Sequence, residues 1–142
     1  MKVTSVFARI SNWLASPEVF GRITKKIPGE WVLYEYYFDE KEKLIHQTED
    51  ELKMNGESLQ IQFHVEESFR TTSKLALPVF DHLKEGNWSV RRNYITLVDP
   101  TDFRNNLEFQ FAFEKENLKL LKKNKMGKIE FFGFFKSTGL KK

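Results

Sequence analysis

The chain has 142 residues, of which 40% are hydrophobic and 15% aromatic, with 14 phenylalanines and no cysteine. This length fits one domain with its own core, and the composition is that of a globular protein rather than a disordered one. The lack of cysteine excludes disulfides, thiolate zinc sites and a cysteine nucleophile. No apolar run approaches the roughly 18 residues of a membrane helix, so we expect no integral membrane segment.

The net charge of +3 is unevenly distributed. Residues 1–29 hold five basic residues and one acidic, residues 30–68 three basic and eleven acidic, and residues 69–142 fifteen basic and eight acidic. Such asymmetry is compatible with an anionic partner. We favour mutual compensation between segments that a small closed sheet makes neighbours. We expect no nucleic-acid partner, because the lysines of residues 115–128 have no interleaved aromatic residues on which bases could stack.

Residues 1–28 are expected to form an N-terminal helical segment that packs on the rest of the domain or caps it. Their apolar residues have the spacing of one helical face: Val3, Val6, Phe7, Ile10, Trp13 and Leu14. The run from Ser16 to Glu18 predicts the start of a second helix, which Pro28 closes. Arg9 interrupts the apolar stretch that a signal peptide requires. We therefore expect a cytoplasmic protein, with a periplasmic or secreted location as the alternative if an export signal was removed.

From Trp31 onward, apolar and polar residues alternate, which is typical of antiparallel strands with one buried face. About eight or nine short strands are expected, at roughly 31–38, 44–54, 57–65, 67–74, 87–92, 94–98, 106–114, 117–123 and 128–136. Asn55-Gly56 is a strong hairpin signal, since both central positions of such a turn favour positive φ. Later turns are expected at Arg92-Asn93, Glu116-Asn117 and residues 124–127.

The expected strands follow one another as hairpins, and closing them into a barrel removes their exposed edges. The one longer connection is residues 75–86, where Pro78 argues against a central strand. The fold predicted for residues 29–142 is therefore an all-β, antiparallel up-and-down barrel of about eight strands. A two-layer sandwich is the alternative.

Two glycine–tryptophan pairs occur at strand starts, at Gly29/Trp31 and Gly86/Trp88. Gly29 is expected to allow a tight turn so that Trp31 points inward and plugs one barrel end, and the second pair to repeat this. A G-x-W at the first strand, after a short helix and before a meander, resembles the lipocalin (calycin) superfamily and, more closely, its small bacterial lipocalin-like domains. The resemblance covers about residues 28–136 and implies a barrel that binds a small hydrophobic molecule. The T-D-Y-like turn of classical lipocalins is absent, and Lys136 stands where they have arginine.

An eight-stranded barrel is either filled by its own side chains or wide enough for one small ligand. If Asn55-Gly56 is a two-residue turn, strand parity places His46, Thr48 and Asp50 on the interior face with Glu35 and Tyr37, as a polar cluster for a ligand head group. The expected ligand-binding residues are Glu35, Tyr37, His46, Thr48, Phe63, Trp88, Phe109 and Phe111. The alternative is that residues 44–54 are a solvated segment, in which Thr48 to Glu51 fits a helical capping box.

The function we expect is non-enzymatic binding of a lipid- or fatty-acid-like molecule by a monomer or weak dimer. The three histidines lack metal-ligand spacing, so no metal or cofactor is expected. A filled barrel that acts as a structural or interaction module is the first alternative. A barrel isomerase, lyase or hydrolase with Glu35 and His46 as its acid–base pair is the second. In the last strand Phe132 and Phe134 are expected to point outward, under the apolar face of the N-terminal helix.

Overall fold

The computed structural model describes residues 24–139. They form nine strands, one short α-helix and three 3-10 turns. The strands are β1 (Gly29–Glu40), β2 (Lys43–Gln47), β3 (Ser58–Phe63), β4 (Ser68–Lys74), β5 (Glu85–Arg91), β6 (Tyr94–Val98), β7 (Leu107–Glu114), β8 (Asn117–Lys123) and β9 (Ile129–Ser137); the helix is α3 (Glu49–Met54) and the turns are η1 (Thr24–Lys26), η2 (Pro78–Phe80) and η3 (Phe103–Asn105). The helices predicted in residues 1–28 lie outside the described residues, apart from η1.

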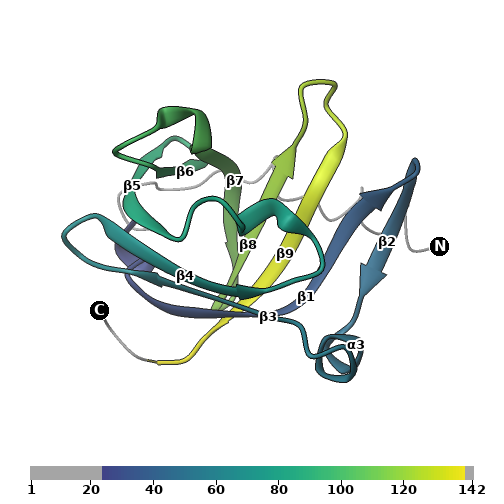
Figure 1. Ribbon diagram of the computed structural model, residues 1–142. Coiled ribbons are helices and arrows are strands. Elements are labelled where there is room, and N and C mark those ends of the chain that lie inside the picture. The colour runs from purple at the N-terminus through teal and green to yellow at the C-terminus, as the bar shows by residue number, and fades with distance from the viewer. Residues whose placement is uncertain (1–23, 140–142) are drawn as a thin grey trace.

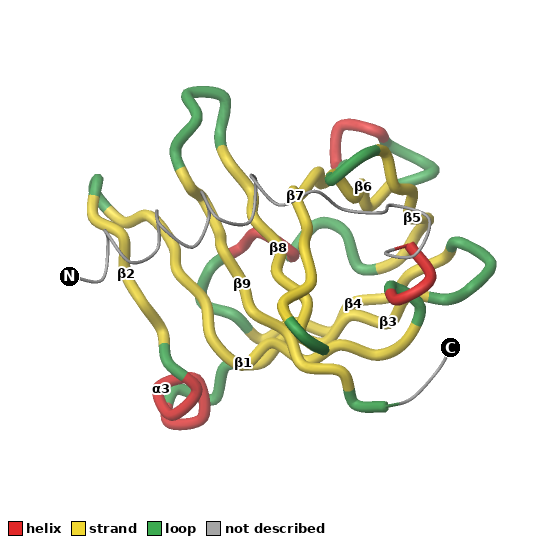
Figure 2. The backbone as a smooth tube through the Cα atoms, turned by 180° about the vertical axis from the view of Figure 1, so that it is seen from behind, coloured by secondary structure: helices red, strands yellow, loops and turns green. Residues whose placement is uncertain are grey.

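The strands form a closed antiparallel barrel, because β1 also pairs with β9 at the far end of the strand order. β1 and β3 to β9 make up the eight barrel strands (Figure 1). β2 lies beside the barrel and pairs only with the second half of β1, whose first half pairs with β3. Figure 2 shows the same closure from behind. The predicted eight-stranded barrel is confirmed.

The predicted strand over residues 44–54 is wrong in its second half. β2 ends at Gln47, and Thr48 then caps α3: its side chain accepts a hydrogen bond from the Glu51 backbone, while the Glu51 side chain accepts one from the Thr48 backbone. This capping box starts a helix where strand parity was expected to continue. Asn55 and Gly56 (φ +67°) therefore end a helix and do not turn a hairpin.

The remaining turns mostly lie where the sequence places them. Arg92-Asn93 joins β5 to β6, and the last hairpin turns at residues 124–127, where Gly127 has φ +82°. The β7–β8 turn lies at Lys115-Glu116, one residue earlier than predicted, because Glu114 pairs with Asn117.

A β-bulge in β1 reverses the expected orientation of its second half. The register against β9 shifts between Leu33 and Glu35. One inserted residue moves every later side chain of the strand to the opposite face of the sheet. Tyr36 consequently points into the interior, whereas Tyr37 belongs to an apolar cluster on the outside and Glu35 lies opposite the outward Phe134. The prediction that Glu35 and Tyr37 face the interior is therefore wrong.

Trp31 and Trp88 are buried, as expected, and each indole group also makes a hydrogen bond. The Trp31 indole N–H donates to the Ile27 carbonyl at 2.9 Å, and the Trp88 indole N–H to the His64 carbonyl at 3.0 Å. Gly29 has φ +141°, a conformation that favours glycine. Gly86 is required for a different reason: a Cβ atom there would lie 2.1 Å from the Val98 carbonyl oxygen.

Candidate functional site

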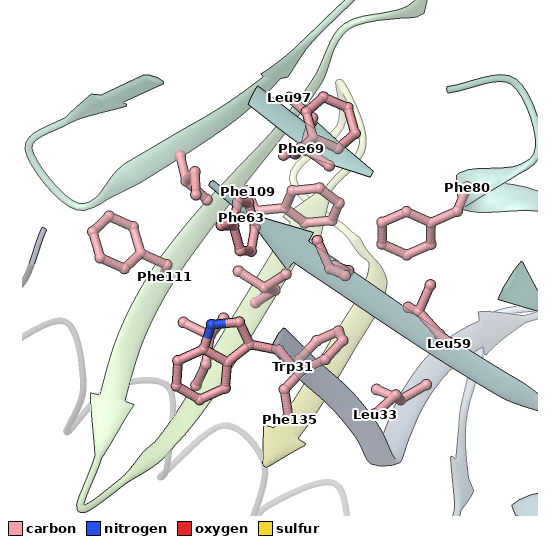
Figure 3. Packing of buried hydrophobic residues seen from close by; sticks show 14 of the residues in the cluster. Trp31, Leu33, Leu59, Phe63, Phe69, Phe80, Leu97, Phe109, Phe111 and Phe135 are labelled. Atoms are coloured by element: carbon pink, nitrogen blue, oxygen red, sulfur yellow. The ribbon is translucent and has the colours of Figure 1, made fainter. Parts of the chain in front are cut away.

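The barrel interior is an aromatic core. Phe63, Trp88, Phe109 and Phe111, the four apolar residues predicted to line a pocket, all belong to this interior cluster. Figure 3 shows Phe63, Phe109 and Phe111 within it. Neighbouring rings touch one another: the ring centroids of Phe63 and Trp88 lie 5.7 Å apart in an edge-to-face arrangement. Such contacts add to the stability that burial of the rings provides.

Phe80, which no sequence pattern singled out, occupies the interior from a loop. It lies in η2, within the connection from β4 to β5, and has no exposed surface. Its ring stacks on Phe109 at 5.6 Å and meets Phe131 edge-on at the same distance. In Figure 3 its side chain points toward the other core rings from a ribbon that is not a strand. A loop residue therefore fills interior space that the strands enclose.

The signal for this insertion is present in the sequence. Within "LALPVFDHL", residues 75–83, large apolar residues recur in what is otherwise a connection. Phe80 and Leu83 are fully or almost fully buried, and Leu75, Leu77 and Val79 pack against the same cluster. Such a density of large apolar residues is unusual for a surface loop. We call residues 75–84 the mouth segment. Their composition is enough to predict that they are part of the core.

Glu57 attaches the beginning of the mouth segment to the barrel wall. Its carboxylate accepts hydrogen bonds from the Tyr36 hydroxyl at 3.1 Å and from the Ala76 backbone N–H at 2.7 Å. Burial, followed by the Glu57 charge, raises the pKa of Tyr36, so this phenol stays protonated and remains a donor. At the other end of the segment, the Thr71 N–H donates to the Lys84 carbonyl at 2.7 Å.

A groove of about 330 Å³ adjoins the mouth segment, lined by Asp39, Leu77, Pro78, Val79 and Glu130. Three of these residues belong to the mouth segment itself. The two polar ones are acidic, and Glu130 is paired with the Lys122 ammonium at 2.8 Å. The groove therefore joins an apolar floor, contributed by the mouth segment, to an acidic rim.

The polar residues predicted for the site come together, but outside the barrel. His46 Nε2 lies 2.6 Å from Glu35 Oε2, and the imidazole stacks on the Tyr37 ring at 4.2 Å. A carboxylate–imidazole pair of this geometry can exchange a proton. It lies on the outer face at the β1–β2 hairpin, so it cannot hold the head group of a ligand inside the barrel. Thr48, as the cap of α3, and Asp50, exposed in its first turn, are not part of the site either.

Within residues 24–139 no group of three or more histidine, aspartate or glutamate side chains is arranged to hold a metal ion. No helix in that part of the chain is long and apolar enough to cross a membrane. Comparison of the chain with protein-family models, with curated proteins and with solved structures gives no match.

Proposed function

We propose that this protein is a lipocalin-like barrel that binds a slender apolar or amphipathic molecule, such as a lipid or a fatty-acid derivative, without transforming it chemically. The observation that carries the proposal is the position of Phe80. The space beside Phe109 and Phe131 in the aromatic interior is occupied by a side chain from a loop, and a loop can withdraw while the barrel stays closed. In the bound state, the ligand occupies the place of this ring.

The volume available sets the shape of the ligand. A cavity of about 150 Å³ admits one benzene-sized molecule, whereas drug-sized ligands need pockets of about 300 Å³ or more. Withdrawal of the Phe80 ring alone supplies only the smaller kind of space. Withdrawal of Leu83 with it lengthens the space along the mouth segment, which suits a chain-like ligand better than a wide one.

The charges at the mouth favour certain head groups. Asp39 and Glu130 line the groove that such a ligand would enter, and the Lys122 ammonium beside it is already bound to Glu130. Like charges repel across a binding surface. A neutral or cationic head group is therefore favoured over a free carboxylate.

The test compares Phe80→Ala with Phe63→Ala, using native mass spectrometry and the uptake of an apolar fluorescent dye. Both changes remove a fully buried ring, and truncations of this kind cost about 3–5 kcal/mol, so general loosening would affect both alike. We expect Phe80→Ala to take up at least ten times more dye than Phe63→Ala at equal folded fraction. Equal uptake by the two variants would overturn the proposal.

A second candidate function has one observation in its favour. Phe63, Phe80, Phe109, Phe131 and Phe135 all have no exposed surface, which favours a barrel filled by its own side chains. A permanently filled barrel would serve as a structural or protein-interaction module. This candidate predicts a protein mass without bound molecules, and no dye uptake by the wild-type chain at any temperature below unfolding.

A further inference from the structure

The outer face of the barrel carries a second apolar cluster, separate from the interior. The outer patch consists of Tyr37, Ala112, Leu121, Ile129, Phe132 and Phe134. These residues come from β1, β7, β8 and β9, which are neighbours in the barrel. Phe132 and Phe134 point away from the interior, as the sequence predicts, yet neither has any exposed surface. Two fully buried rings on the outside of a barrel make this face a packing surface.

The charges at the edge of the outer patch are already paired. The Lys119 ammonium lies 3.0 Å from a Glu114 carboxylate oxygen and 5.7 Å from the centroid of the Phe134 ring. Lys136 lies over the Tyr34 ring at 4.6 Å. These cations are engaged with groups of the barrel itself, so the patch suits an apolar occupant better than an anionic one.

The turn η1 lies beside Phe113 near the end of β7, and the Phe113 ring packs on the interior cluster. The Lys26 ammonium lies 5.7 Å from the centroid of the Phe113 ring, and Phe113 follows Ala112 of the outer patch directly. The chain from Leu14 to Thr24 can span up to about 33 Å. Even as a helix this stretch would span about 15 Å, which is about the width of four neighbouring strands.

The dimensions of the two surfaces also agree. Four neighbouring strands span three spacings of about 4.8 Å, or about 14 Å. Residues 3–14 would extend about 18 Å as a helix. Their apolar face, formed by Val3, Val6, Phe7, Ile10, Trp13 and Leu14, matches the outer patch in chemistry and in length.

We propose that the outer patch is the docking surface for the apolar face of residues 3–14 of the same chain. The N-terminal segment then covers the wall of the barrel and leaves the mouth segment and its groove open. This assignment is independent of what the interior binds.

Thiol reactivity tests the proposal, because the chain contains no cysteine. Ala112→Cys places a single thiol in the outer patch of the full-length protein. Adding Ile10→Asp puts a charge on the apolar face of residues 3–14, and we expect it to speed labelling of this thiol at least tenfold. The matched control is Asn12→Asp, on the opposite face of the same segment, which should leave the rate within twofold. A thiol from Thr72→Cys, at an exposed position on β4, should label equally fast in all backgrounds.

A second variant covers the case in which Ala112→Cys does not fold. Ile10→Cys leaves the barrel unchanged, and its thiol should label at least ten times more slowly than that of Asn12→Cys. Equal labelling of Ala112→Cys with and without Ile10→Asp, or equal rates for Ile10→Cys and Asn12→Cys, would overturn the proposal. Protection that appears only at high protein concentration, or only with added lipid vesicles, would also overturn it, because a second copy or a membrane would then be the occupant.

Discussion

The Tyr36 hydroxyl donates a hydrogen bond to the Glu57 carboxylate at 3.1 Å, and this one carboxylate also holds the Ala76 N–H at 2.7 Å. Tyr36 is a barrel-wall residue whose ring lies 5.7 Å from that of Phe131, one of the two rings that contact Phe80. Glu57 thus connects the wall to the segment that carries Phe80. We expect this connection to control how readily the mouth segment leaves the barrel.

Glu57→Gln should weaken the connection without removing its acceptor oxygen. A hydrogen bond to a charged group contributes about 1.5–3 kcal/mol and a neutral one about 1 kcal/mol, so we expect the free energy of unfolding to fall by about 1 kcal/mol. Tyr36→Phe should have an effect of similar size, because it removes the donor and keeps the ring. Urea titration measures the stability change, and stopped-flow dye uptake should be several-fold faster in both variants.

Glu66→Gln provides the control for net charge, since Glu66 is an exposed acidic residue in the β3–β4 turn. It should change neither stability nor uptake. If Glu57→Gln and Tyr36→Phe are destabilised but take up dye at the wild-type rate, the connection is structural and does not control entry.

Gly86→Ala should be more harmful than Gly127→Ala, although Gly127 has the unusual backbone conformation. A Cβ atom at position 86 would lie 2.1 Å from the Val98 carbonyl oxygen, which cannot move without disturbing the β5–β6 pairing. We expect a loss of about 3 kcal/mol, at the upper end for overpacking. At Gly127 the φ of +82° costs about 1 kcal/mol for alanine, and the space around it is open. Thermal unfolding of the two variants measures the difference, and equal losses would contradict this account.

The alternation of apolar residues was sufficient to predict the barrel. In β3, Leu59, Ile61 and Phe63 are fully buried while the residues between them are not, as period-two patterning requires. Each strand from β3 to β9 has one face of alternating apolar residues or lies next to a turn that can be recognised in the sequence. The inward orientation of Trp31 could also be predicted, because it depends only on neighbouring residues: Trp31 lies two residues after Gly29 at the start of a strand.

The polar half of the site could not be predicted, for two physical reasons. The bulge between Leu33 and Glu35 leaves no mark in a sequence that is apolar or aromatic on both sides of it, so parity counted from Trp31 fails at Tyr37. At Thr48 two local signals competed, and the reciprocal hydrogen bonds of the capping box favoured helix over strand. The density of large apolar residues in 75–83 predicts that this segment is buried, but the contacts of Phe80 with Phe109 and Phe131, which are distant in sequence, could not be predicted.

Glu35→Gln and His46→Gln should leave the ligand-binding behaviour of the barrel unchanged. Their side chains meet on the outer face, away from Phe80 and the mouth segment. Because both side chains are partly exposed, loss of the pair should cost about 1 kcal/mol or less. Dye uptake within twofold of the wild-type value, measured beside Phe80→Ala, would agree with this placement. A tenfold change would show that the outer pair communicates with the interior.

The loop that follows β6 should lose its structure in acid before the barrel does. The Asp99 carboxylate accepts hydrogen bonds from Asn105 Nδ2 at 3.0 Å, from the Thr101 N–H at 2.9 Å and from the Thr101 hydroxyl at 2.8 Å. These bonds, that from Asn105 foremost, lower the pKa of Asp99 to about 2. Because the folded pKa lies below the usual value of about 3.9, the contribution of Asp99 to stability is complete above about pH 4 and is lost as the pH falls toward about 2.

Asp99→Asn tests this assignment, since it keeps the shape of the side chain and removes its titration. Amide hydrogen exchange of Thr101 and Asp102, compared at about pH 5 and about pH 2.5, on either side of the usual carboxyl pKa, should show a loss of protection in the wild-type protein that is much smaller in the variant. Arg104 lowers the pKa of Asp102 in the same turn, so some pH dependence should remain after the change at Asp99. Glu66→Gln should retain the full wild-type response. An unchanged response in Asp99→Asn would instead assign the acid sensitivity of this loop to Asp102, because its carboxylate accepts bonds from the Arg104 backbone and guanidinium at 2.9–3.1 Å.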